Sequence, residues 1–262
     1  MLAKFSLDDR AFGAVQSDHA CRPLMIRTSH TMSPSSNSLA AFLLLILASA
    51  CSSVGPESVG LDSLDATYYL DNREFNTLNL QIATKLPGNL SIWGFTDFHG
   101  NQGVGHGFGN LRRSFSEYRL SHGGLGAALG VKGLGMQAEY NLLTPSDQDL
   151  GRFGLTYRHD LPLPGTGRTG WLQWRAFPIE TDGNGGQASL IYSLPLTESM
   201  SIGGFADFNL IEDAPHRWIL EPQLNLKVAD GFWAVLEYRY NGFEGAGGLD
   251  GSGWAAGVKA SF

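Results

Sequence analysis

The chain has 262 residues, of which 16% are charged, 11% are aromatic and 34 are glycine, and its formal net charge at pH 7 is −7. The negative net charge and the lack of a basic stripe argue against nucleic acid as a partner. Typical soluble domains carry more charge, about 25%, and no apolar run reaches the ~18 residues of a transmembrane helix. Low charge with many aromatics favours a barrel whose alternating strands cross a membrane.

The first 50 residues divide into an extension and a predicted targeting sequence. Residues 1–24 hold three aspartates, unlike the positive start of a signal peptide, so we interpret them as a mis-assigned extension before a start at Met25. Residues 25–50 predict a lipoprotein-type signal peptide, because the apolar run "LAAFLLLILASA" ends just before Cys51. Cys51 is then the lipidated first residue, and Ser52 favours the outer membrane. The alternative is ordinary cleavage near "ASA", which leaves Cys51 unmodified.

Residues 51–63 are small and polar and predict a tether, and residues 64–262 predict one β-barrel domain without a helix. In that domain, segments of period two are separated by turn residues. The predicted strands are 64–70, 76–86, 90–98, 113–121, 134–142, 152–161, 170–178, 187–196, 199–209, 217–228, 231–241 and 252–262.

Alternation assigns two faces to each segment. In "RWILEPQLNLKV" (217–228), Trp218 and Leu220 share an apolar face, whereas Glu221 and Gln223 share a polar one. A soluble sandwich also alternates. Aromatic residues near strand ends, and short connections that alternate with long ones, favour a barrel instead. Two connections, 122–133 and 162–170, are longer than this pattern expects.

The predicted fold class is therefore all-β: a closed antiparallel transmembrane β-barrel of twelve strands. An open edge in lipid would leave backbone groups unpaired at several kcal/mol each. We expect the bacterial outer membrane as the location, with the N-terminus and the C-terminus both in the periplasm. The expected partners are outer-membrane lipid and lipopolysaccharide, whose phosphates Arg112 and Arg113 would contact.

The polar faces predict a charged lumen in which opposite signs meet across neighbouring strands. Glu237 and Arg239 beside Glu221 and Lys227, and Glu117 and Arg119 beside Glu139, offer such pairs. Further charges on the inner face are Lys85, Asp97, Arg152, Arg158, Asp160, Arg175, Asp207 and Lys259. Such a set either fills and stiffens the interior or forms a constriction that sorts solutes. Its near balance of charge fits neutral polar solutes.

Four aromatic residues also fall on the inner face: Trp93, Phe95, Phe205 and Trp233. Aromatic rings stack on bases at about 1–3 kcal/mol each, and Asp97 with Asp207 could accept hydrogen bonds from a ribose. The alternative is space filling in a narrow barrel. The candidate pore and substrate residues are Trp93, Phe95, Asp97, Glu117, Arg119, Glu139, Arg158, Arg175, Asp207, Glu221, Lys227, Glu237 and Arg239.

One segment carries a family resemblance. "TLNLQIATKLPGNLSIWGFTDFHG" (77–100) resembles the nucleoside-specific channel (Tsx-type) family of twelve-stranded outer-membrane barrels, with its aromatic-Gly-aromatic-x-Asp run at 93–97. "RSFSEYRLS" (113–121), with Glu117 as the matching acidic residue, and the tail "GWAAGVKASF" are also similar to that family. The resemblance implies a narrow pore, largely filled by side chains, that binds nucleosides weakly.

The sequence therefore predicts a channel for passive diffusion of small polar solutes, such as nucleosides, with no cofactor and no metal. One alternative is a structural lipoprotein barrel. Another is an outer-membrane lipid hydrolase or deacylase, which needs a serine and a histidine together on the lipid-facing wall. His159 and Ser116 point outward but stand apart in the pattern, and His99, His106 and His216 fall in expected loops. We therefore expect no enzyme activity.

Overall fold

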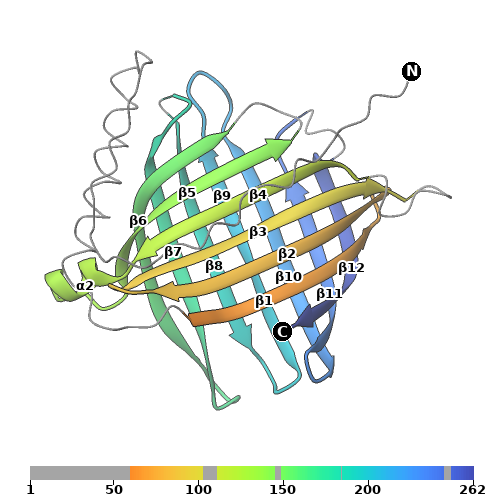
Figure 1. Ribbon diagram of the computed structural model, residues 1–262, viewed down its shortest axis with the longest axis horizontal. Helices are drawn as coiled ribbons and strands as arrows, with labels where there is room; N and C mark the ends of the chain where they lie inside the picture. Colours follow the sequence, from red (N-terminus) through yellow and green to blue (C-terminus); the bar gives the residue numbers. More distant parts are fainter. Residues whose placement is uncertain (1–59, 103–110, 145–148, 184, 245–248) are drawn as a thin grey trace, which may run out of the picture.

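The computed structural model describes residues 60–102, 111–144, 149–183, 185–244 and 249–262. In this part of the chain twelve strands form one antiparallel sheet that closes into a barrel (Figure 1). The predicted fold class is therefore confirmed. The elements are β1 (Gly60–Asp71), β2 (Phe75–Leu86), β3 (Leu90–Asn101), β4 (Leu111–His122), α2 (Gly124–Leu129), β5 (Leu134–Thr144), β6 (Leu150–Leu163), β7 (Arg168–Glu180), β8 (Gly186–Pro195), β9 (Met200–Leu210), β10 (Arg217–Ala229), β11 (Phe232–Asn241) and β12 (Gly251–Ser261).

The barrel closes where the first strand meets the last. Asp65 of β1 lies opposite Ser261 of β12, and Asp71 lies opposite Ala255. The amide of Phe262 donates a hydrogen bond of 2.9 Å to the Leu64 carbonyl. The alternating C-terminal segment is thus the strand that seals the sheet, so neither β1 nor β12 is left as an open edge.

The two faces of the wall differ as the alternation predicts, but the usual arrangement of a soluble protein is inverted. Most of the buried side chains in the described residues are polar or charged, and many large apolar side chains are exposed. On the outer face Trp174, Trp218 and Trp254 are 50%, 47% and 52% exposed. The hydrogen-bonding side chains thus lie inside the barrel, and the apolar side chains cover its outside.

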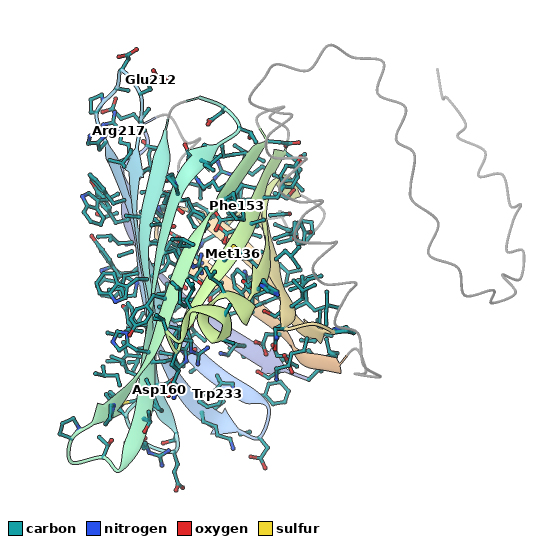
Figure 2. The ribbon with its side chains drawn as sticks, turned by 90° about the vertical axis from the view of Figure 1, so that its left-hand side faces the viewer. Met136, Phe153, Asp160, Glu212, Arg217 and Trp233 are labelled. Carbon is teal, nitrogen blue, oxygen red and sulfur yellow. The ribbon has the colours of Figure 1, made fainter. Side chains whose placement is uncertain are left out.

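The two ends of the barrel carry different connections. We call the rim that holds Gly60 and Phe262 the terminal rim, and the opposite rim the loop rim; Asp160 marks the former and Arg217 the latter in Figure 2. At the terminal rim β10 and β11 are joined by a two-residue Asp-Gly turn. Gly231 there has a φ of 73°, which a side chain would oppose.

Three local features depart from the sequence predictions. The connection 122–133 contains the helix α2, which lies at one end of the barrel (Figure 1). The connection 162–170 is mostly strand, because β6 runs to Leu163 and β7 begins at Arg168. The first strand begins at Gly60, within the expected tether. No helix in the described residues is long and apolar enough to cross a membrane.

Candidate functional site in the barrel lumen

The interior of the barrel holds a cavity of about 1060 Å³. Its lining reaches from Asp65 and Lys259 near the terminal rim to Phe243 and Leu249 at the loop rim. The cavity therefore extends along most of the barrel's length. Nine of the thirteen predicted pore residues border it: Trp93, Phe95, Asp97, Glu117, Arg119, Asp207, Glu221, Glu237 and Arg239.

A first group of buried charges centres on Glu139, which is 3% exposed. Three arginines approach its carboxylate: the nitrogen–oxygen distances are 3.4 Å from Arg119, 3.1 Å from Arg152 and 3.4 Å from Arg175. Two of these arginines form a second ion pair each: Arg119 with Glu117, and Arg152 with Glu180 at 2.5 Å. We call this group the Glu139 cluster: Glu117, Arg119, Glu139, Arg152, Arg175 and Glu180.

Strand register explains how this cluster forms. Glu139 on β5 lies directly opposite Arg119 on β4 and directly opposite Arg152 on β6. Residues opposite each other in an antiparallel pair have Cβ atoms about 4.5–5.5 Å apart, so the three side chains form one row across the wall. Arg175 joins this row from β7. The predicted pairing of Glu117 and Arg119 beside Glu139 is confirmed.

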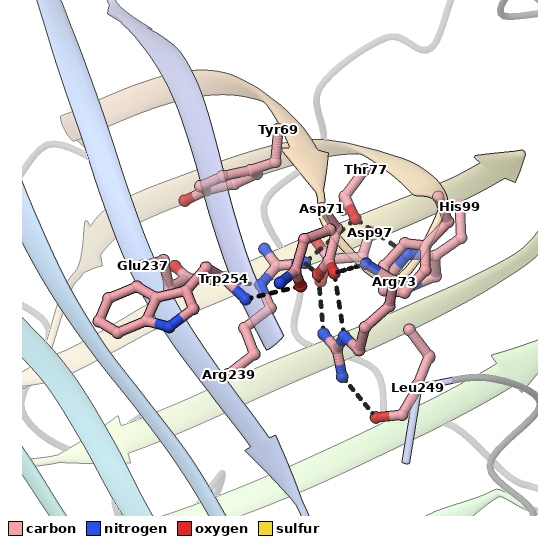
Figure 3. A network of polar contacts seen from close by, with 12 residues as sticks. Tyr69, Asp71, Arg73, Thr77, Asp97, His99, Glu237, Arg239, Leu249 and Trp254 are labelled. Carbon is pink, nitrogen blue, oxygen red and sulfur yellow. Dashed lines mark hydrogen bonds and ion pairs between the residues drawn. The ribbon is translucent and has the colours of Figure 1, made fainter. Parts of the chain in front are cut away.

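A second group lies on the wall formed by β1, β2, β3 and β11 and is shown in Figure 3. The fully buried carboxylate of Asp71 accepts a hydrogen bond of 2.8 Å from Arg73 and lies 3.6 Å from Arg239. Arg239 also pairs with Glu237 and donates a 3.2 Å hydrogen bond to the Thr77 hydroxyl. The members of this Asp71 cluster are Asp71, Arg73, Thr77, His99, Glu237 and Arg239.

Both clusters leave few charges without a partner. Removing one member of a buried ion pair typically costs 3–5 kcal/mol, because the remaining charge stays buried and unpaired. Arg152 extends the Glu139 cluster toward β9 through a 3.3 Å hydrogen bond to Asn209. In the same way Gln223 bridges Glu237 and the Tyr69 hydroxyl, at 2.7 Å each. The clusters therefore brace the lumen from opposite parts of the wall.

Aromatic rings form the part of the lining between β3 and β4. The ring centroids of Trp93 and Phe95 are 5.4 Å apart, and those of Phe95 and Phe115 are 5.7 Å apart. The Arg119 guanidinium lies 4.1 Å from the Trp93 ring centroid. Next along the inner face of β3, Asp97 accepts a 2.7 Å hydrogen bond from the Asn79 amide. Aromatic faces and a carboxylate thus meet at one place in the cavity.

Some predicted pore residues do not border the cavity. Glu139 and Arg175 lie behind it, within the Glu139 cluster. Lys227 instead forms an ion pair of 2.6 Å with Asp230 in the terminal-rim turn. The hydrogen bond from Lys227, together with the positive charge of the lysine, lowers the pKa of Asp230. Arg158 stacks on Trp171, 4.2 Å from its ring centroid. Lys227 and Arg158 thus lie outside the cavity lining, and their role in the pore stays a prediction.

Two predicted lumen charges near the terminal rim pair with neighbours at that end of the barrel. Asp160 pairs with Lys132 at 3.7 Å, and Lys85 pairs with Asp62 at 3.1 Å. The side chain of Asp160 is 61% exposed and that of Lys85 is 75% exposed. These predicted lumen charges therefore contact solvent at the mouth of the barrel.

The predicted inner aromatics divide between the cavity and the wall. Phe205 borders the cavity. Trp233 packs beside the buried group of Tyr69, Val235 and Ala255, with Lys259 5.6 Å from its ring centroid. Trp233 therefore fills space, which is the alternative that the sequence left open.

The expectation that His99 lies in a loop was wrong, and Arg113 has a neighbour that the sequence did not predict. His99 belongs to β3, is 5% exposed and lies 3.1 Å from the Thr77 hydroxyl. Arg113, which we expected to contact lipopolysaccharide, borders the cavity, 5.8 Å from the Phe75 ring centroid. Their parity with Asp97 and Phe115 could have placed them inside. Asp71 and Arg73 gave no such signal, because Arg73 lies in a turn and folds back into the barrel.

The residues considered for lipid hydrolysis contact other groups. The Ser116 hydroxyl lies 2.9 Å from that of Thr96, and the His159 ring stacks on Tyr157 at a centroid distance of 5.7 Å. His216 lies in the loop between β9 and β10. His106 and Cys51 lie outside the described residues. Within those residues no group of three His, Cys, Asp or Glu side chains is placed to hold a metal ion.

Comparison with known proteins finds similarity of fold only. No family model matches the sequence, and no curated protein does. Among solved structures, a NanC porin is 8% identical with a TM-score of 0.51, over 76% of this chain and 98% of that one. A KdgM porin, also solved in complex with disordered oligogalacturonate, is 11% identical with a TM-score of 0.47, over 76% and 99% of the two chains. This chain thus has a barrel like that of NanC porin.

Proposed function

We propose that this protein is an outer-membrane channel through which small polar solutes, nucleosides among them, diffuse passively. The observation that carries the proposal is a cavity of about 1060 Å³, lined largely by polar side chains, inside a closed wall with an apolar outside. Large exposed apolar surfaces are rare on soluble monomers. A lipid environment accounts for them, because outer-membrane barrels face lipid with apolar residues and keep polar residues inside.

The positions of the first residue of β1 and of the C-terminal residue support an orientation. Gly60 and Phe262 lie at the same rim, where the short Asp-Gly turn also lies. Outer-membrane barrels have short periplasmic turns and longer extracellular loops. We therefore place the terminal rim in the periplasm, and the loop rim against lipopolysaccharide.

The lining offers a basis for weak nucleoside binding. Phe95 presents a ring to the cavity two residues from Asp97 on the same face of β3. A base stacked on an aromatic ring gains about 1–3 kcal/mol, and a carboxylate accepts hydrogen bonds from ribose hydroxyls. The two charged clusters would keep the wall in shape while a solute passes.

Conductance across a planar lipid bilayer tests this function. We expect the purified barrel to give stepwise currents, and adenosine to reduce them as it occupies the lumen. Phe95→Ala should weaken the effect of adenosine, and the control Phe98→Ala, on the outer face of the same strand, should leave it unchanged. Failure to see any current steps would refute the channel, and steps indifferent to adenosine would leave a pore without nucleoside binding.

A further inference from the structure

The six basic side chains that border the cavity are all engaged by neighbouring groups. Arg119, Arg152 and Arg239 form ion pairs with buried glutamates. Arg73 pairs with Asp71. Arg113 and Lys259 lie against aromatic rings, at 5.8 Å from the Phe75 centroid and 5.6 Å from the Trp233 centroid. The positive charge of the lining is therefore compensated or covered within the wall.

The acidic side chains of the cavity are not matched in the same way. Glu117 and Glu237 are paired with arginines. Asp65, Asp97, Asp207 and Glu221 also border the cavity, and in the described residues none of them forms an ion pair with a cationic group within 4.0 Å. Asp97 is held by the neutral amide of Asn79, which leaves its charge uncompensated. Four carboxylates thus border the cavity without an ion-pair partner among the described residues.

Three of these carboxylates, Asp97, Asp207 and Glu221, lie beside aromatic residues of the lining. Glu221 on β10 lies directly opposite Phe205 on β9, whose next inward residue is Asp207. Asp97 follows Phe95 on the inner face of β3. Asp207 is 9% exposed and borders the cavity. Aromatic faces attract cations and not anions, by ~0.5–1 kcal/mol or more. Each of these carboxylates therefore lies beside a ring that, like the carboxylate, attracts cations.

We infer that the lumen is selective for small cations, protonated amines included, over anions of similar size; this inference rests on the proposed channel function. Carboxylates in a cleft with low-dielectric walls concentrate the field and raise the local cation concentration. The arginines of the two clusters do not cancel this field, because their charge is matched there. The two other cations of the lining, Arg113 and Lys259, are outnumbered by the four carboxylates. Asp97, Asp207 and Glu221 are the residues that determine the selectivity.

The test is the reversal potential of the bilayer-reconstituted barrel under a KCl gradient at pH 8. We expect potassium to be favoured over chloride by about fivefold, the factor that corresponds to ~1 kcal/mol of attraction. Removing the three charges together, in Asp97→Asn with Asp207→Asn and Glu221→Gln, should abolish the preference. Glu221→Gln alone disturbs no ion pair and should reduce the preference for potassium only partly.

A matched control removes three carboxylates at the terminal rim, in Asp62→Asn with Glu198→Gln and Asp230→Asn. These side chains are 39%, 94% and 99% exposed, and at 1 M salt the screening length is about 3 Å, so the preference should persist. Equal or greater permeability to chloride, or a preference that survives both Glu221→Gln and the triple lumen variant, would overturn the inference and leave the channel standing. Absence of current would instead refute the channel and the inference with it.

Discussion

The central role of Glu139 makes a quantitative prediction about stability. The change Glu139→Gln removes one negative charge that lies 3.1–3.4 Å from three arginines. At an effective dielectric constant of about 20, each such contact contributes roughly 5 kcal/mol before desolvation. Burial of Glu139, whose side chain is 1% exposed, costs several kcal/mol in the opposite direction. The variant also leaves three arginines near one another without their shared counter-charge.

We therefore expect Glu139→Gln to lower the free energy of unfolding by about 3–5 kcal/mol, the range measured when one partner of a buried pair is lost. Urea titration of the barrel in lipid vesicles, followed by tryptophan fluorescence, would measure it. With a slope of about 3 kcal/mol per molar urea, the midpoint should fall by at least ~1 M.

The matched control is Glu198→Gln, whose carboxylate is 94% exposed and lies 3.5 Å from Arg168. A surface pair of this kind contributes about 0–1 kcal/mol, so its midpoint should barely move. Equal midpoints for the two variants would show that the Glu139 cluster contributes no more than a surface pair, and would refute the reasoning.

Three further predictions concern the lumen, the outer wall and the lipid anchor. Gly203 borders the cavity, and an added Cβ would lie 3.4 Å from its nearest neighbour, so Gly203→Trp should fold and lower single-channel conductance; unchanged conductance would contradict the assigned path. Leu236 lies on the outer face of β11 and is 43% exposed. Leu236→Arg should lower the free energy of unfolding in vesicles by about 2–4 kcal/mol, and an unchanged free energy would argue against lipid contact. Metabolic palmitate labelling should vanish in Cys51→Ser, and a label that persists would refute the predicted lipidation.

Alternation along the chain was enough to predict the twelve strands and their faces, because a closed wall between two environments forces a period of two. The alternation predicted that Glu117, Arg119 and Glu139 lie together, because two consecutive strands pair as a hairpin in a register that their connection determines. It did not predict α2, whose sequence "GLGAAL" holds two glycines, poor helix formers. The C-cap Gly130, with a φ of 69°, ends this helix.

The remaining differences between the sequence predictions and the structure concern how far along the barrel axis a side chain lies. Parity gives the face of Lys227 and Arg158, but not that each lies near the rim, where Asp230 and Trp171 are the nearer partners. Nor does parity show that Arg73 turns back from a loop to reach Asp71. Such contacts depend on strand tilt and rotamers, which a one-dimensional pattern does not contain.

The seam between β1 and β12 also affects the order of folding. Asp65 and Ser261 are paired although they come from the two ends of the described chain, so this pairing has the longest loop to close and the largest entropic cost. Hairpins between consecutive strands can form earlier, as each requires only local contacts. Pairing of the last strand therefore closes the curved, open sheet into a barrel. A chain without this strand would keep two unpaired strand edges, which could hydrogen-bond to other molecules.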